Sequence, residues 1–197
     1  MKSMIGVLVA LVLCVCIATT VSAEEKMKEP EKEGDVWYAR CNLKLLDGKD
    51  ITWVNWQAAP TYVPVGTKLR VTRAGNMASV VNVESKAVYT LDVGGEGEAL
   101  LEKFITKTPA DVTKFPEDVQ TNIRNAVAKI GMTKEQVYIA MGPPTNLIKE
   151  RTREMTYEGI MAGDLWVYAR RRFGKDIGVA FDPVTHRVNR TEGIWGK

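Results

Sequence analysis

The stretch 130-IGMTKEQVYIAMGPPT-145 defines a short helix with two marked ends. Thr133 and Gln136 have the spacing of a capping box, in which each side chain bonds the backbone N–H of the other residue. Gly142 is suited to cap the C-terminus, and Pro143-Pro144 prevents the helix from continuing. The sequence therefore predicts a helix that begins after Thr133 and ends before Gly142.

A second helix is expected before this stretch, and strands are expected after it. The preceding apolar residues make one stripe at helical spacing: Val119, Ile123, Ala126, Val127 and Ile130. Pro116 suits the first turn of that helix, and Gly131 ends it. The following apolar residues alternate with period two: Leu165, Val167 and Ala169, then Ile177, Val179 and Phe181, then Val188. This order predicts a helix pair on one face of a three-stranded antiparallel sheet.

The residues of this half resemble those of a known family. The run from Ile130 to Thr145, with Asp164-Leu165-Trp166-Val167-Tyr168 and Val179-Ala180-Phe181-Asp182 after it, resembles the SmpA/OmlA (BamE-like) domain. The resemblance implies a helix-helix-three-stranded domain over residues 117–195. It also implies an envelope protein of a Gram-negative-type bacterium, similar to non-catalytic lipoproteins of the outer-membrane β-barrel assembly machinery. The implied partners are envelope proteins, with outer-membrane assembly components among the candidates.

The preceding region, residues 36–105, has the pattern of a β-rich domain. Residues Trp37 to Leu45 alternate between apolar and polar side chains, and four further strand-like runs cover Ile51–Trp56, Lys68–Arg73, Met77–Val83 and Ala87–Val93. A short helix over Glu98–Ile105 follows, and residues 106–116 form a linker. These features predict a small antiparallel barrel or sandwich. The expected fold class of the whole chain is therefore α+β.

The N-terminus has the features of an export signal. Lys2 precedes the apolar run Met4–Ala18, and Val21-Ser22-Ala23 forms a small-residue cleavage pattern. We therefore expect cleavage after Ala23 and a charged tether over residues 24–35, which contain almost only Glu and Lys. In the alternative, Cys14 or Cys16 is the lipidated first residue of a lipoprotein, and in a further alternative the apolar run stays uncleaved as an anchor. Either signal predicts export to the periplasm or to the periplasmic face of the outer membrane.

The composition argues against several classes of function. The chain has 197 residues, a formal net charge of +3, three cysteines and one histidine. Two cysteines lie in the predicted signal, so Cys41 alone remains, which excludes a disulfide framework and a multi-cysteine metal site. The net charge is too small to favour nucleic acid as a partner. His186, the single histidine, has no spacing to other residues that predicts catalysis or metal binding. We therefore expect no enzymatic activity, no metal and no cofactor.

A partner-binding face is expected on the first strand after the helix pair. If Leu165, Val167 and Ala169 face the helices, alternation directs Trp166, Tyr168, Arg170 and Arg172 to the opposite face. Aromatic residues and arginines often anchor interfaces, and arginine can also contact anionic lipid. In the alternative, Trp166 and Tyr168 are covered by the first domain or by residues 147–161, and the arginines form an ordinary solvated face.

The function expected from these features is that of a scaffold or accessory factor at the outer membrane. The alternative is a soluble periplasmic binding or inhibitor protein whose ligand lies between the two predicted domains.

Overall fold

A computed structural model describes residues 35–170 and 175–194. Four predictions lie outside these residues: the signal over residues 1–23 with its cleavage after Ala23, the lipidation of Cys14 or Cys16, nearly all of the tether, and the place of Arg172. Residues 34–197 form one compact unit. Among the described residues, no helix combines the length and the apolar character needed to cross a bilayer.

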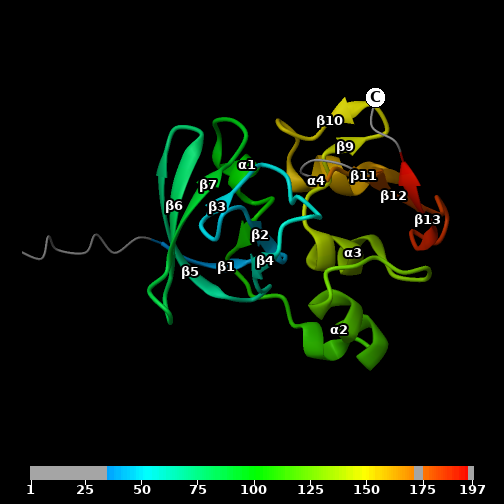
Figure 1. Cartoon of the computed structure of the whole chain (residues 1–197), viewed down its shortest axis with the longest axis horizontal. Helices are drawn as coiled ribbons and strands as arrows, with labels where there is room; N and C mark the ends of the chain where they lie inside the picture. Colours follow the sequence, from blue (N-terminus) through cyan, green and yellow to red (C-terminus); the bar gives the residue numbers. More distant parts are fainter. Residues whose placement is uncertain (1–34, 171–174, 195–197) are drawn as a thin grey trace, which may run out of the picture. The chain divides into compact units, whose positions relative to one another are not determined.

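The first half of the unit forms a six-stranded sheet, curled into a half-barrel, and a two-stranded sheet (Figure 1). The order in the larger sheet is β3-β7-β6-β5-β1-β8, and only β3 and β7 pair in parallel. Its strands are β1 (Val36–Ala39), β3 (Asp50–Ile51), β5 (Lys68–Ala74), β6 (Met77–Asn82), β7 (Val88–Asp92) and β8 (Ile105–Thr106). The smaller sheet pairs β2 (Leu43–Leu45) with β4 (Thr61–Val63).

The second half forms helices and a five-stranded antiparallel sheet with the order β10-β9-β11-β12-β13. Helix α1 (Glu98–Leu101) precedes β8 and belongs to the first half, and the helices of the second half are the 3-10 turn η1 (Val112–Lys114), α2 (Glu117–Arg124), α3 (Lys134–Met141) and α4 (Tyr157–Ala162). The strands are β9 (Asn146–Leu147), β10 (Glu150–Arg151), β11 (Leu165–Tyr168), β12 (Asp176–Phe181) and β13 (Val188–Ile194).

The expected α+β fold class, a small barrel or sandwich followed by a helix-helix-three-stranded domain, is wrong. The described residues are mostly β, with four α-helices and three sheets, and the second half does not match the BamE-like arrangement. The difference comes mainly from residues 146–162, which add β9, β10 and α4 to the expected elements. In the first half, the expected strand over Trp37–Leu45 breaks at Arg40–Asn42, so that β1 and β2 join different sheets.

The local signals around α3 are confirmed. The Thr133 hydroxyl accepts from Gln136 N–H, the Gln136 side chain accepts from Thr133 N–H, and Gly142 caps the C-terminus with φ +73°. α2 ends earlier than expected, at Arg124, because Ala126 takes the left-handed conformation with φ +53°. The residues after α2 therefore leave the helix axis and lead to α3 through a connection that turns again at Ile130 and Gly131.

Two buried asparagines join the two halves of the unit. The Asn42 amide donates to the carbonyls of Ile123 (2.7 Å) and Ala140 (3.1 Å), at the C-terminal ends of α2 and α3. The Asn55 amide donates to Met141 O at 3.2 Å. These bonds give side-chain donors to carbonyls at the helix ends, where the helix itself leaves carbonyls unpaired, and Ile123 O also accepts from Ala126 N–H at 3.0 Å. Buried apolar residues from both halves belong to one core around this junction.

Candidate functional site

The structure reverses the predicted partner-binding face of β11. Trp166 and Tyr168 have no exposed surface, whereas Leu165 and Ala169 are partly exposed. Trp166 packs edge-on against Tyr138 of α3 and against Phe181. The face that we expected to be open is therefore the one that the helices cover, and Trp166 and Tyr168 cannot serve as surface anchors.

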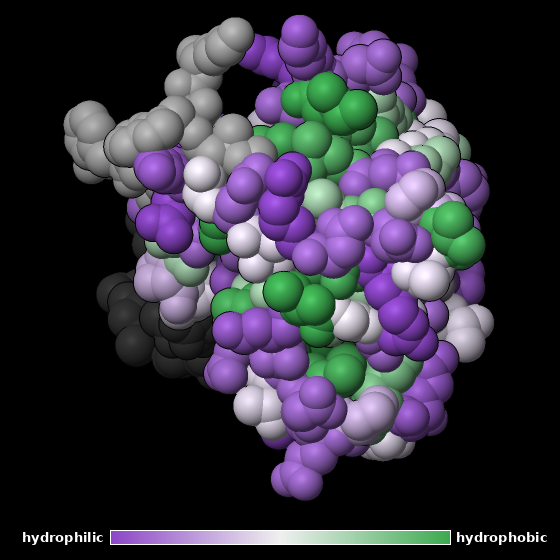
Figure 2. Space-filling model, turned by 90° about the vertical axis from the view of Figure 1, so that its right-hand side faces the viewer, coloured by the Kyte–Doolittle hydropathy of each residue, from purple (hydrophilic) through white to green (hydrophobic). Residues whose placement is uncertain are grey.

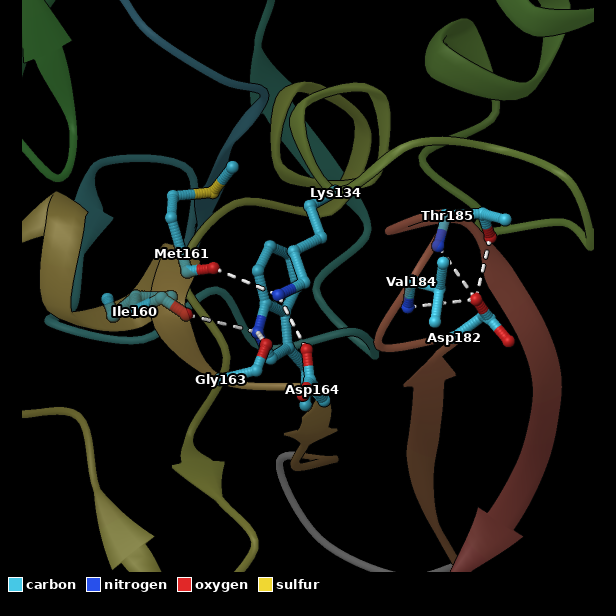
Figure 3. A network of polar contacts seen from close by, with 9 residues as sticks. Lys134, Ile160, Met161, Gly163, Asp164, Asp182, Val184 and Thr185 are labelled. Atoms are coloured by element: carbon cyan, nitrogen blue, oxygen red, sulfur yellow. Dashed lines mark hydrogen bonds and ion pairs between the residues drawn. The ribbon is translucent and has the colours of Figure 1, made fainter.

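Hydrogen bonds hold both aromatic residues in the core. The Trp166 indole N–H donates to the carbonyls of Ile160 (3.2 Å) and Gly163 (3.1 Å), which frame the end of α4 (Figure 3). The Tyr168 hydroxyl donates to Gly142 O at 3.0 Å, and burial raises its pKa well above the usual value. Both polar atoms are satisfied inside the protein, which is the condition for burying such residues.

Of the predicted site residues that the structure describes, Arg170 is the one that lies at the surface. It follows Tyr168 by two residues, at the end of β11, and it lines a groove of about 560 Å³ that we call the Arg170 groove. The groove lies between residues 126–129, which connect α2 to α3, and the ends of β12 and β13. Its lining comprises residues 126–129, Met141, Gln57, Arg170, Lys175, Ile177 and residues 191–193.

Five segments that are distant in the sequence build this groove. The left-handed Ala126 directs the connection across the sheet, and the Gln57 N–H bonds Ala169 O at 3.3 Å. Gly193 leaves space for the Lys175 side chain, whose carbons would lie 3.0–3.1 Å from a Cβ at position 193. Because these residues meet only in the folded chain, no local pattern predicts the groove. Arg170 is the one residue of its lining that the sequence predicted to bind a partner.

The groove combines apolar and cationic side chains. Met141 is buried and Ile177 is partly buried, whereas Lys129, Arg170 and Lys175 are exposed. Among the described residues of the lining, Glu192 is the one carboxylate, and it lies 3.6 Å from Arg190. The lining thus has an excess of positive charge. Figure 2 shows the face on which β13 and the α2–α3 connection lie, with hydrophobic residues in separate clusters among hydrophilic ones.

His186 lies at a different opening, of about 510 Å³, near the N-terminus of α3. Lys134 also lines it, and its ammonium bonds Asp164 at 2.8 Å and Met161 O at 3.1 Å (Figure 3). Asp182 accepts hydrogen bonds from the N–H groups of Val184 and Thr185, which forms the expected turn. These contacts already pair the charge of Lys134. The presence of Lys134 is therefore no evidence that this opening binds an anion.

Cys41 is buried, and burial raises the pKa of its thiol to about 12, which disfavours the nucleophilic thiolate. Within residues 35–170 and 175–194, no three His, Cys, Asp or Glu side chains are placed to hold a metal ion.

No family model, curated protein or solved structure matches this chain. The resemblance to the SmpA/OmlA (BamE-like) domain stays a prediction from the residues that carry it.

Proposed function

We propose that this chain is an exported, non-enzymatic protein of the cell envelope that binds a partner protein in the Arg170 groove and serves as a scaffold or accessory factor. The observation that carries the proposal is the composition of the groove, in which the partly buried Val127 and Ile177 lie beside the exposed Lys129 and Arg170. Apolar surface next to arginine is typical of the residues that anchor protein interfaces. The export signal predicted over residues 1–23 assigns this binding to the envelope.

A second candidate function is the binding of a small molecule in the same groove by a soluble periplasmic protein. The volume of about 560 Å³ favours it, because small-molecule sites usually measure about 300–1,000 Å³. An anionic ligand would suit the cations in the lining.

Site-specific photo-crosslinking in cells tests the proposal. A photoreactive amino acid replaces Lys129 in the groove, and in the control it replaces Val88, which is 61% exposed on β7 of the other sheet. We expect a protein adduct of defined mass from position 129 that fractionates with the outer membrane. Position 88 should not give this adduct, and Arg170→Glu should abolish it.

Two results contradict the proposal. In the first, positions 129 and 88 give the same protein adducts. In the second, position 129 gives no protein adduct. Release of the chain by osmotic shock, together with a small molecule that stays bound in native mass spectrometry and is lost with Arg170→Glu, supports the second candidate instead.

A further inference from the structure

We propose that the Arg170 groove takes an extended, acidic segment of a partner protein, and that this segment adds a strand to the free edge of β13. The inference rests on the proposed function and names the chemistry of the partner. Strand addition of this kind uses main-chain hydrogen bonds for affinity and alternate side chains for specificity.

The chain already uses the first part of this edge for main-chain pairing. β13 is an edge strand, and Gly131 N–H donates to Val188 O while Val188 N–H donates to Met132 O, both at 2.8 Å. A bridge between Thr133 and Arg187 continues this pairing. The connection before α3 thus behaves as a short added strand, which shows that the edge of β13 can pair with a further chain segment.

The later part of the edge directs backbone groups outward at Thr191. Phe181 N–H donates to Asp164 O, toward β11, so its neighbour Ala180 directs its backbone groups toward β13. Ala180 pairs with Arg190. Backbone direction alternates along a strand, so the N–H and C=O of Thr191 point away from β12.

The same alternation turns the backbone groups of Gly193 outward. Both residues are exposed, and no backbone hydrogen bond from the described part of the chain reaches these outward groups. Edge strands are commonly protected by a bulge. The irregularity in β12–β13 pairing lies between Ala180 and Phe181, at the end that the chain itself covers. Among residues 35–170 and 175–194, no such irregularity protects the end next to the groove.

The charge of the groove defines the added segment. Thr191 and Gly193 also line the groove, so alternate side chains of a strand paired with them would face Lys129 and Arg170. Aspartate or glutamate at those positions would complement the cations. A terminal carboxylate would instead lie at the end of the strand, in the plane of the sheet. The geometry therefore favours acidic side chains within the segment.

Peptide binding to the full chain tests this inference. The probe is a fluorescent nine-residue peptide, capped at both ends, in which Glu alternates with Val. The comparison peptides replace Glu by Gln, or carry Gln and a free C-terminal carboxylate. We expect the Glu peptide to bind at least about tenfold more tightly than either comparison peptide, and Arg170→Glu to remove this preference. Binding should weaken as salt increases.

A proline variant tests the strand pairing separately from the charge. Thr191→Pro removes one outward N–H without removing a bond to β12, and edge positions of this kind tolerate proline. We expect Thr191→Pro to lower the affinity for the Glu peptide at least about tenfold, whereas the Thr191→Val variant should bind this peptide as tightly as the original chain does. Hydrogen exchange on the original chain, independent of how the variant folds, should show that the peptide protects the Thr191 and Gly193 amides.

Equal binding of the Glu and Gln peptides overturns the inference, and so does unchanged exchange at Thr191 and Gly193. Preference for the free carboxylate peptide overturns the choice of acidic side chains. Groove-specific cross-links in cells without binding of the Glu peptide contradict this inference and leave the proposed function standing. Binding of the Glu peptide without cross-links in cells contradicts the proposed function alone.

Discussion

The side-chain amide of Asn55 occupies the space that a Cβ atom at position 142 would need. A Cβ built on Gly142 would lie 1.8 Å from Asn55 Nδ2. The same nitrogen donates to Asn42 O at 2.6 Å and to Met141 O at 3.2 Å, so it cannot move away without losing both bonds. The glycine that ends α3 is thus required by packing against the first half of the unit as well as by its backbone conformation.

Gly142→Ala should destabilise the protein strongly. The added methyl group clashes with Asn55, and φ +73° is unfavourable for alanine. We expect the free energy of unfolding in urea to fall by at least about 3 kcal/mol. Gly48→Ala is the matched control, because Gly48 has φ +78° but a Cβ atom there would meet no other atom within 4 Å. It should cost only about 1–2 kcal/mol.

A double-mutant cycle separates the clash from the backbone term. In an Asn55→Ala background, Gly142→Ala should cost less than it does in the original chain, because the amide that lies 1.8 Å from the built Cβ is gone and the Cβ of residue 55, at 3.2 Å, is the part of that side chain that stays close. Full additivity of the two substitutions would contradict the packing argument.

Asn42→Ala should also destabilise the unit, by about 2–4 kcal/mol. The substitution leaves the carbonyls of Ile123 and Ala140 without their side-chain donor, and Val65 N–H without the Asn42 oxygen that accepts it at 3.1 Å. All these groups lie at the junction between the two halves. Asn189→Ala on the exposed part of β13 should change the free energy of unfolding by less than about 0.5 kcal/mol. Equal effects in urea unfolding would contradict the role assigned to Asn42.

The sequence predicted those features that a few neighbouring residues determine. Thr133, Gln136 and Gly142 specify both ends of α3 through contacts within the helix and its caps, and the structure has those contacts. The two-residue strands β8, β9 and β10 are too short to show a period-two pattern. They form because other strands offer them backbone partners, and this information is not local.

The predicted site failed for a related reason. Alternation along β11 separates Trp166 and Tyr168 from Leu165 and Val167, but both sets are apolar enough to face a core. The choice is made by Tyr138, which packs against Trp166 from α3. The surface position of Arg170 can be predicted from the sequence, because a charged residue at the end of a strand is rarely buried. The residues around Lys129 show no pattern that predicts its place in the groove.

Lys103 should make stability depend on pH in a specific window. It is fully buried, and its ammonium donates to the carbonyls of Thr152 and Arg153. Desolvation, helped by the positive charge of Arg153, lowers its pKa from 10.5 to about 8. Between pH 8 and 10.5 the unfolded chain binds more protons than the folded chain, so the Lys103 contribution to stability rises with pH.

The variant Lys103→Met isolates this effect from other groups that titrate at alkaline pH. The difference in unfolding free energy, original chain minus variant, should increase between pH 8 and 10.5, by up to about 3 kcal/mol. Below pH 8 the difference should be constant. A constant difference for Lys103→Met across the window would contradict the lowered pKa.

Trp166→Ala and Arg170→Ala should affect different properties of the protein. Trp166 is fully buried, so its truncation leaves a cavity and should cost about 3–5 kcal/mol in urea unfolding. Arg170 is exposed at the groove, so Arg170→Ala should leave stability within about 0.5 kcal/mol and weaken peptide binding. A stable Trp166→Ala variant that loses binding would instead support the face expected from the sequence.

Cys41 should report the opening of the junction between the two halves. Its thiol is fully buried, its pKa is raised to about 12 by burial, and its sulfur lies 4.0 Å from Asn55 Nδ2. In a chain with Cys14 and Cys16 replaced by alanine, iodoacetamide at about pH 8.5 should therefore alkylate Cys41 only through opening of the protein. We expect the folded chain to react at least about 1,000-fold more slowly than the chain in guanidinium, measured by intact mass.

Adding Gly142→Ala to this chain connects the rate to stability. If alkylation requires global opening, a loss of about 3 kcal/mol should accelerate it by about 100-fold, since about 1.4 kcal/mol corresponds to a factor of ten. Gly48→Ala should accelerate it by no more than about 30-fold, in proportion to its smaller cost. Rapid labelling of the folded parent chain would show that Cys41 is accessible. Equal rates in the parent and Gly142→Ala chains would show that Cys41 reacts through a local opening that does not involve the Asn55–Gly142 contact.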